Sequence, residues 1–302
     1  MVLAIRDRKM MHGIVSINKS AFIKVRSIHD NYLLVRQVAR KIHASKVSGT
    51  FLKLDISRAF DSLNWPFLFE VLKRRGFARK WLHWVSTLLS TTCTKIIANG
   101  VPSRPIAHAQ GLTQGDPISP LIFVIAMDSL SAILCKATEI GVLISFRYIS
   151  PLQRLSVYAD DVAMFIRPTN MDLISVRELL DIFGEASGLR INYTKSVSIL
   201  IRGSEEDGVR VTDVLHCRLN KFSCKYLGIP MTIEKLSRAH WQPLPDQFRK
   251  LIHAWQCGMI GRPGRLRLAK PVISARPIHQ LLVLNVSTWI FEEIDKWMKA
   301  FF

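Results

Sequence analysis

The stretch LSVYADDVAMFI, residues 155–166, decides the fold that we predict for this chain. It is rich in β-forming side chains, and Ala159-Asp160-Asp161 interrupts it at its centre. This pattern predicts a β-hairpin with acids at its tip. An Asp-Asp pair in a turn is most often turn chemistry alone. Acids bounded by apolar strands are nevertheless costly unless cations compensate for them, so these two are candidate metal ligands.

Another candidate carboxylate lies on a separate predicted strand. Residues 51–57, FLKLDIS, form a short apolar run that is broken by Asp55. The run predicts a buried strand that carries one acid towards its C-terminal end. A sheet that brings Asp55 and Asp160 to one edge would offer hard oxygen ligands, which suit Mg²⁺. Two such ions, roughly 4 Å apart, stabilise the attacking and leaving oxygens in phosphoryl transfer.

Turn signals and apolar periodicity predict the elements around these two strands. Helices are predicted from Pro66 to Gly76, over 78–89, from a Ser119 cap to Leu134, and over 170–187 with an Asn170 cap and Gly188 at the end. Strands are predicted over 142–149 and 189–201, and a hairpin around Asn99-Gly100. Helices near 246–257, 265–275 and 289–300 follow. The order predicts an α+β part over 1–230 and a helical part over 231–302.

The charge of the chain points to a polyanionic partner. Its 302 residues include 42 Lys and Arg against 23 Asp and Glu, a net charge of +19. Nucleic acid is the first candidate, and an anionic membrane or mere solubility are the alternatives. The five cysteines are odd in number and scattered, which favours neither a disulfide framework nor a zinc knuckle. No uninterrupted apolar run reaches the length of a membrane span, so we expect an intracellular protein without a membrane partner.

A loop with the sequence QGDPISP, residues 114–120, leads into the helix predicted from Ser119. Free backbone N–H groups at a helix start can face a phosphate or a base. The alternative is an ordinary connecting loop. On its own, the segment is a weak indication of a binding site.

Five motifs occur in the order found in reverse transcriptases. They are FLKLDISRAFDSLNW (51–65), QGDPISPLIF (114–123), YADD (158–161), GLRINYTKS (188–196) and KYLGIP (225–230). From about Ile14 to its end the chain resembles the non-LTR, LINE-type retrotransposon enzymes of plants. The resemblance implies a right-hand polymerase with an antiparallel palm sheet, partial fingers and a helical thumb. It also suggests a piece of a longer protein, with truncated fingers over the start of 1–230 and a truncated thumb over 231–302.

The resemblance implies roles for the acids and their neighbours. Asp55 and Asp160 would bind two catalytic Mg²⁺ ions, or Mn²⁺, and Asp161 would complete the acidic tip. Phe60 matches an aromatic gate against the ribose 2′-OH, although core packing would equally explain its ring. Lys195 matches a lysine proposed to protonate the leaving pyrophosphate, and otherwise it is a solvated strand lysine.

Other positions match contacts with substrate and nucleic acid. Gln114 and Gly115 resemble residues that line the incoming nucleotide and the template, and Lys24 and Arg26 match basic finger positions. Tyr226, Leu227 and Gly228 resemble the primer grip, which holds the primer 3′ end. Basic and aromatic residues of the tail resemble the thumb, with a plain helical bundle as the alternative: Trp241, Trp255, Arg262, Arg265, Arg267 and Lys270.

Two positions depart from the pattern of the family. Val25 stands where Gly is expected, and a β-branched residue adopts a positive φ only at a cost, so altered backbone geometry is expected there. Thr113 replaces a common Arg and removes a cation.

The implied function is an RNA-directed DNA polymerase that takes an RNA template, a DNA primer and dNTPs. The alternatives are a catalytically impaired nucleic-acid-binding remnant and a maturase-like intron protein. The place where such elements copy themselves implies the nucleus.

Overall fold

The computed structural model describes residues 11–246, 249–250, 261–268, 275–284, 286 and 288–301. The chain divides into two compact units, Met1–Lys221 and Phe222–Phe302. The division into polymerase and thumb-like parts that was expected after residue 230 stays a prediction.

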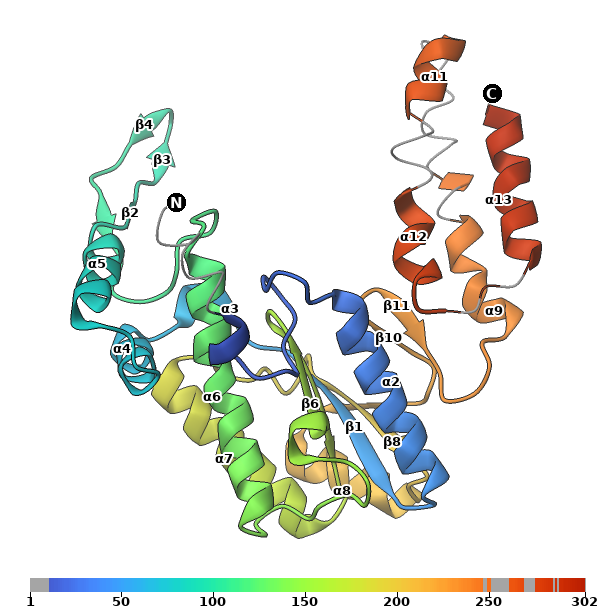
Figure 1. Cartoon of the computed structure of the whole chain (residues 1–302), viewed down its shortest axis with the longest axis horizontal. Helices are drawn as coiled ribbons and strands as arrows, with labels where there is room; N and C mark the ends of the chain where they lie inside the picture. Colours follow the sequence, from blue (N-terminus) through green and yellow to red (C-terminus); the bar gives the residue numbers. More distant parts are fainter. Residues whose placement is uncertain are drawn as a thin grey trace. The chain divides into compact units, whose positions relative to one another are not determined.

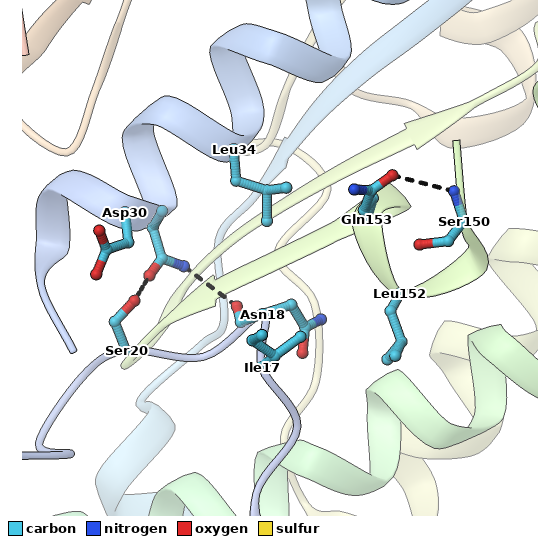
Figure 2. Close-up of a pocket in the computed structure, with 9 residues that line it drawn as sticks. Ile17, Asn18, Ser20, Asp30, Leu34, Ser150, Leu152 and Gln153 are labelled. Atoms are coloured by element: carbon cyan, nitrogen blue, oxygen red, sulfur yellow. Dashed lines mark hydrogen bonds between the residues drawn. The ribbon is translucent and has the colours of Figure 1, made fainter. Parts of the chain in front are cut away.

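A five-stranded sheet forms the centre of the first unit, in the order β6-β7-β1-β8-β9 (Figure 1). These strands are β1 (Gly49–Leu54), β6 (Leu155–Tyr158), β7 (Asp161–Ile166), β8 (Val197–Ile201) and β9 (Arg218–Asn220). Strand β1 pairs antiparallel with β7 and β8, and β6 pairs antiparallel with β7. Only the β8–β9 pair is parallel. The hairpin predicted over 155–166 is confirmed, with its acids at the β6–β7 turn.

Helices cover the sheet because each strand alternates apolar side chains between its two faces. Leu52 and Leu54 of β1 join a large core with α4 (Trp65–Arg74), α6 (Ser119–Glu139) and α7 (Asn170–Ser187). Helix α2 (Ile28–Ala44) packs against β6 and β8 (Figure 1). Its Asn31 amide donates to Ser156 Oγ and to the Val157 carbonyl of β6. Helices therefore cover the sheet, and α2 is hydrogen-bonded to β6.

The remaining elements of the first unit are shorter. They are α3 (Ala59–Ser62), α5 (Arg79–Ser90), β2 (Cys93–Thr94), β3 (Ile97–Ala98), β4 (Val101–Pro102), β5 (Ile106–Ala107), the 3-10 helix η1 (Pro151–Arg154) and α8 (Glu205–Leu215). Strands β2 to β5 form the arm of a hairpin whose turn, Asn99-Gly100, has a positive φ at both residues. This is the turn chemistry that Asn-Gly predicts.

The second unit combines a hairpin with short helices. They are β10 (Cys224–Tyr226), β11 (Ile229–Met231), α9 (Arg238–Trp241), α11 (Arg262–Leu268), α12 (Ala275–Leu281) and α13 (Thr288–Phe301). Helix α13 confirms the helix predicted near 289–300. The helix predicted near 246–257 lies mostly outside the described residues, as do Trp255, Lys270 and part of the helix predicted over 265–275.

Some local predictions were wrong. Residues 142–149 form no strand, because Leu143, Phe146 and Ile149 are buried singly while their neighbours face solvent. The strand predicted over 189–201 is regular only from Val197. Ser119 does not cap α6: Ile118 is the cap residue, and the buried Ser119 Oγ has no hydrogen-bond partner. Thr169, one residue before Asn170, accepts the capping bond of α7.

By length and hydropathy, α6 is long and apolar enough to cross a membrane. It includes Asp128, Ser129 and Ser131, so no uninterrupted apolar run marked it in the sequence. In the structure 67% of its most apolar window is buried. A core helix of a globular domain has the same properties, so the helix is weak evidence for a membrane.

Candidate active site

The register of the sheet brings the candidate acids together in the backbone. Leu54, the last residue of β1, is paired with Val162 of β7. Asp55 follows Leu54 directly and Asp161 precedes Val162, so the two positions are neighbours across the strands. Asp160 is one residue further along, in the two-residue turn between Tyr158 and Asp161. Two strands more than a hundred residues apart therefore deliver their acids to one end of the sheet.

The turn that carries Asp160 is conformationally unusual. Ala159, its first residue, has a φ of 54°. An L-residue pays for a left-handed conformation, and strain of this kind concentrates at functional sites. Among the two turn residues, only Ala159 has a positive φ, which matches the sign pattern of a type II′ hairpin turn. Asp160, the second residue of the turn, is exposed.

Lys53 is a member of the site that the motif-based reasoning missed. Its Nζ lies 3.5 Å from Asp161 Oδ1, with the two side chains 38% and 42% exposed. Because side chains alternate along a strand, Lys53 and Asp55 share a face of β1. This period-two spacing was the signal in the sequence that would have found it. The lysine places a positive charge beside the acids, in a position where a metal ion would compete with it.

The backbone of Asp55 is fixed by the segment that carries Lys195. The Asp55 N–H donates to Ser196 Oγ at 3.1 Å, and the Asp55 carbonyl accepts from the Asn192 N–H at 2.8 Å. Ser196 Oγ in turn donates to the Asn192 carbonyl. Lys195 itself is exposed. The structure therefore brings the segment that contains Lys195 to the backbone of Asp55, and the role of the Lys195 ammonium stays a prediction.

Phe60 packs inside the protein. Its ring is half-buried and stacks on Phe123, with 4.4 Å between the centroids and 19° between the planes. The Phe60 carbonyl accepts from the Leu112 N–H, which connects it to the loop that contains Gln114. Packing thus explains the ring, and its role as a gate stays a prediction.

Gln114 and Gly115 lie exposed in the loop before α6. Gly115 has a φ of 93°, a conformation that glycine adopts at little cost. The loop is anchored upstream, where the Gly111 N–H donates to the Leu63 carbonyl. Both residues are therefore displayed on an anchored loop, and their contact with nucleotide or template stays a prediction.

The basic finger positions differ from each other. Lys24 is exposed, whereas the Arg26 guanidinium donates to the carbonyls of Val15, Ser16 and Lys19. Burial lowers the pKa of Arg26, partly opposed by the charge of Asp128. These hydrogen bonds give Arg26 a structural role. Contact of Lys24 or Arg26 with a triphosphate stays a prediction.

Val25 has a positive φ, a conformation that glycine adopts more readily than a β-branched residue. Its φ is 72°, and its side chain is 87% exposed. A β-branched residue adopts a positive φ only at a cost, so Val25 bears strain here, and altered geometry relative to the family stays a prediction.

The candidate primer grip belongs to the second unit. Leu227 and Gly228 form the turn between β10 and β11, with φ values of 50° and 78°. The Leu227 carbonyl lies 2.9 Å from His279 Nε2, and Tyr226 is fully buried. The hairpin is therefore a fixed feature of that unit.

The acids fit a divalent cation by their chemistry. Asp55, Asp160 and Asp161 supply the oxygen ligands that Mg²⁺ prefers. No group of three or more His, Cys, Asp or Glu side chains is arranged to hold a metal ion among the residues described. Mg²⁺ commonly uses one or two carboxylates together with substrate phosphates rather than a cage made by the protein alone. A pair of acids at the end of the sheet is therefore sufficient for a site that forms with substrate.

An α+β unit with acids where two antiparallel strands meet is the architecture of a right-hand polymerase. The fold is similar to that of telomerase from Candida albicans, solved in complex with the TWJ fragment of telomeric RNA, with a TM-score of 0.50 and 11% identity. The match covers 99% of this chain and 52% of that one.

The chain belongs to the family described as reverse transcriptase (RNA-dependent DNA polymerase), whose model matches residues 4–231. It is 26% identical over 290 residues to the Pol polyprotein of retrotransposable element R2DM from Drosophila melanogaster, which covers 93% of this chain and 26% of the relative. It is 25% identical over 315 residues to the 149 kDa protein of transposon TX1 from Xenopus laevis, covering 99% of this chain and 23% of the relative.

The chain is therefore a reverse transcriptase domain of the non-LTR retrotransposon type. It spans about a quarter of the length of these two relatives. The family binds a nucleic-acid template and primer, and it typically uses divalent metals.

Proposed function

We propose that this chain copies an RNA template by adding deoxynucleotides to the 3′-OH of a DNA primer. The observation that carries the proposal is the register between β1 and β7, in which Asp55 lies across from Asp161. Asp160 precedes Asp161 in the β6–β7 turn. In a reverse transcriptase domain, this end of the sheet is where nucleotidyl transfer is expected.

Asp55 and Asp160, with Asp161, are the residues proposed to hold two Mg²⁺ ions, or Mn²⁺ in their place. Bound there, the ions supply charge stabilisation for the attacking and leaving oxygens of phosphoryl transfer. The backbone of Asp55 is anchored, because both its N–H and its carbonyl are hydrogen-bonded to the 192–196 segment. This fixed position is the protein's contribution to positioning.

Lys195 is proposed to donate a proton to the leaving pyrophosphate, since it is exposed on the segment that is bonded to Asp55. The Phe60 ring, held by its stack on Phe123, is proposed to exclude a ribose 2′-OH. Gln114, Gly115 and Lys24 are proposed to contact nucleotide or template. The turn at Tyr226, Leu227 and Gly228 is proposed to hold the primer end.

The finer assignments rest on the motifs. We infer that the chain is of the plant LINE type and that it acts in the nucleus, where elements of this type copy themselves. RNA template, DNA primer and dNTPs are its proposed partners. The net charge of +19 supports a polyanionic partner.

Primer extension tests the proposal. A labelled DNA primer annealed to an RNA template is incubated with the chain, dNTPs and Mg²⁺, and products are resolved by length. Extension is expected for the wild type and for Asp213→Ala, a matched control that removes an exposed carboxylate from α8. No extension is expected for Asp160→Ala. Equal extension by Asp160→Ala and wild type would reject catalysis at this site.

Two observations favour a second candidate, a nucleic-acid binder without catalysis. The Lys53 ammonium occupies the neighbourhood of Asp161, and Thr113 provides no cation where the family commonly has one. In that case the wild type binds RNA in a salt-dependent manner but extends no primer at any concentration of Mg²⁺ or Mn²⁺. A maturase-like protein would additionally promote splicing of an intron RNA in a splicing assay.

A further inference from the structure

One stretch of the first unit, residues 71–115, contains several cations and no acidic residue. Between Glu70 and Asp116 there is no acidic residue, while seven Lys and Arg lie in that interval. Arg74 pairs with Glu70 and Arg75 with Asp128, so these two are neutralised. The other five form no ion pair with any described carboxylate: Lys73, Arg79, Lys80, Lys95 and Arg104. An uncompensated run of this kind attracts a polyanion.

The same stretch of chain exposes large apolar side chains. We call α5 and the hairpin that follows it, residues 79–108, the arm. Helix α5 buries Leu82, Val85 and Leu89 and turns Arg79, Lys80, His83 and Trp84 to solvent. The exposed fractions of the large apolar side chains on the arm are Trp84 38%, Leu88 44%, Ile96 58%, Ile97 72%, Val101 68% and Ile106 51%. An exposed aromatic ring among cations, as at Trp84, can stack on a base, and the aliphatic side chains beside it offer apolar contact.

The hairpin has little support from the rest of the unit. It consists of two short ladders, β2 with β5 and β3 with β4, of two residue pairs each. Figure 1 shows it extending from α5 away from the five-stranded sheet, with α4 and α6 between the arm and the sheet in this view. An isolated two-stranded hairpin is marginally stable in water, so its exposed apolar side chains gain most from a partner that covers them.

We propose that the arm is a second nucleic-acid-binding surface, which holds single-stranded RNA outside the acid site. Its cations contact phosphates, and Trp84 with the apolar side chains of the hairpin stacks on or inserts between unpaired bases. A protein partner would suit the apolar side chains equally, but the absence of acidic residues from 71 to 115 favours a polyanion. The proposal goes beyond polymerisation, since it concerns binding alone.

A matched pair of variants tests it. Lys80 Nζ lies 5.4 Å from the centroid of the Trp84 ring, and Arg147 lies 4.9 Å from that of Tyr148, in the loop beyond the C-terminal end of α6. Each pair joins a cation to an exposed aromatic ring. Lys80→Ala/Trp84→Ala is therefore compared with Arg147→Ala/Tyr148→Ala. The probe is a fluorescent single-stranded oligouridine RNA, and unlabelled primer–template duplex is present at saturation to occupy the polymerase site.

The arm variant is expected to weaken binding of the probe about tenfold or more, while the Arg147/Tyr148 variant stays within about twofold of the wild type. Arg79→Ala/Lys80→Ala is expected to reduce the slope of log K against log salt by about 1.4, at 0.7 for each lost phosphate contact. Ile97→Ala/Val101→Ala weakens binding without changing that slope. All these side chains are exposed or lie in the exposed hairpin. The thermal unfolding midpoint of each variant should therefore equal that of the wild type.

Either of two results overturns the proposal. One is equal RNA affinity for the arm variant and the wild type, which would leave a protein partner as the use of the arm. The other is complete displacement of the probe by the primer–template duplex, which would mean a single site. Because the readout is binding, a chain that extends no primer still gives an answer, and the failure of polymerisation is distinguishable from the failure of the arm.

Discussion

Lys19 Nζ lies 2.8 Å from Asp128 Oδ1, and each of the two side chains is only 1% exposed. The Ser16 N–H also donates to Asp128 Oδ1, and the Arg75 guanidinium, which pairs with Asp128, donates to the Ile14 carbonyl. This buried network ties the segment 14–19 to α6. A buried ion pair adds little to stability compared with apolar packing. Removing one partner, however, leaves the other charge buried without a counter-charge.

We expect Asp128→Ala to destabilise the first unit by about 3–5 kcal/mol, because the Lys19 ammonium would be left buried without its counter-charge. Urea unfolding followed by circular dichroism measures the change. The double variant Lys19→Met/Asp128→Leu is expected to recover most of the loss, since it removes both charges and retains volume. If Asp128→Ala is as stable as Asp213→Ala, which removes an exposed carboxylate, this account is contradicted.

The pKa of Asp128 leads to a prediction about pH. Burial raises the pKa of this carboxyl, but the Lys19 charge and the hydrogen bonds from Lys19 and Ser16 outweigh it, so the pKa is lowered from 3.8. An acid with a lowered folded pKa is protonated more readily in the unfolded chain. Its contribution to stability is complete above about pH 4 and is lost as the pH falls through the folded pKa.

The difference in unfolding free energy between wild type and Asp128→Asn should therefore be constant near neutral pH and shrink below about pH 4. Urea titrations at a series of pH values measure it. Burial lowers the pKa of Lys19, and the charge and hydrogen bond of Asp128 oppose that shift. A difference that grows on acidification would show that the sign is wrong.

Val25→Gly is expected to stabilise the protein. The φ of 72° costs a non-glycine residue about 1–2 kcal/mol, and glycine removes this cost. Glycine also raises the conformational entropy of the unfolded chain, which lowers the stability by roughly 0.5–1 kcal/mol. The net gain should be about 0.5–1 kcal/mol. Val25→Ala is the control, since it removes the exposed side chain but keeps the Cβ atom. Equal urea midpoints for Val25→Gly and Val25→Ala would mean that φ strain contributes nothing here.

The parts of the fold that follow local rules were predictable from the sequence. The Asn99-Gly100 turn, the start of α4 near Pro66 and the β6–β7 hairpin each depend on a few adjacent residues whose preferences agree. The segment 142–149 misled because β-formers there serve as single anchors in the core. The segment is apolar, but its buried residues, Leu143, Phe146 and Ile149, recur at every third position, whereas a strand buries every second residue.

The candidate site was predictable in its acids but not in its supports. Asp55 and Asp160 stand out because charge interrupts apolar runs. Lys53, Asn192 and Ser196 do not, since an alternating lysine and two small polar residues are common in any strand or loop. Their importance comes from long-range pairing, in which Asp55 is bonded to residues more than a hundred positions away. Tertiary contacts of this kind leave no local pattern.

Lys53 provides a test of metal binding that is separate from turnover. Removing its charge from beside Asp161 should strengthen the affinity for a divalent cation, by about threefold to tenfold in Kd for Lys53→Gln. Electron paramagnetic resonance of free Mn²⁺ measures the binding. Lys136→Gln is a matched control, because Lys136 Nζ also lies 3.5 Å from a carboxylate oxygen, that of Glu139, away from the site. Weaker binding by Lys53→Gln would indicate that the lysine organises the acids rather than competing for them.

Phe60 tests whether a packed ring also selects the sugar. Its stack on Phe123 fixes the plane of the ring, so both residues should matter, but to different extents. We expect Phe60→Val to lower the preference for dGTP over GTP, expressed as a ratio of kcat/KM values, by about tenfold or more, since the ring that would clash with a 2′-OH is gone. Phe123→Leu keeps the Phe60 ring but loosens it, and should lower the ratio by less. If both variants are merely less stable and keep the wild-type ratio, the ring serves packing alone.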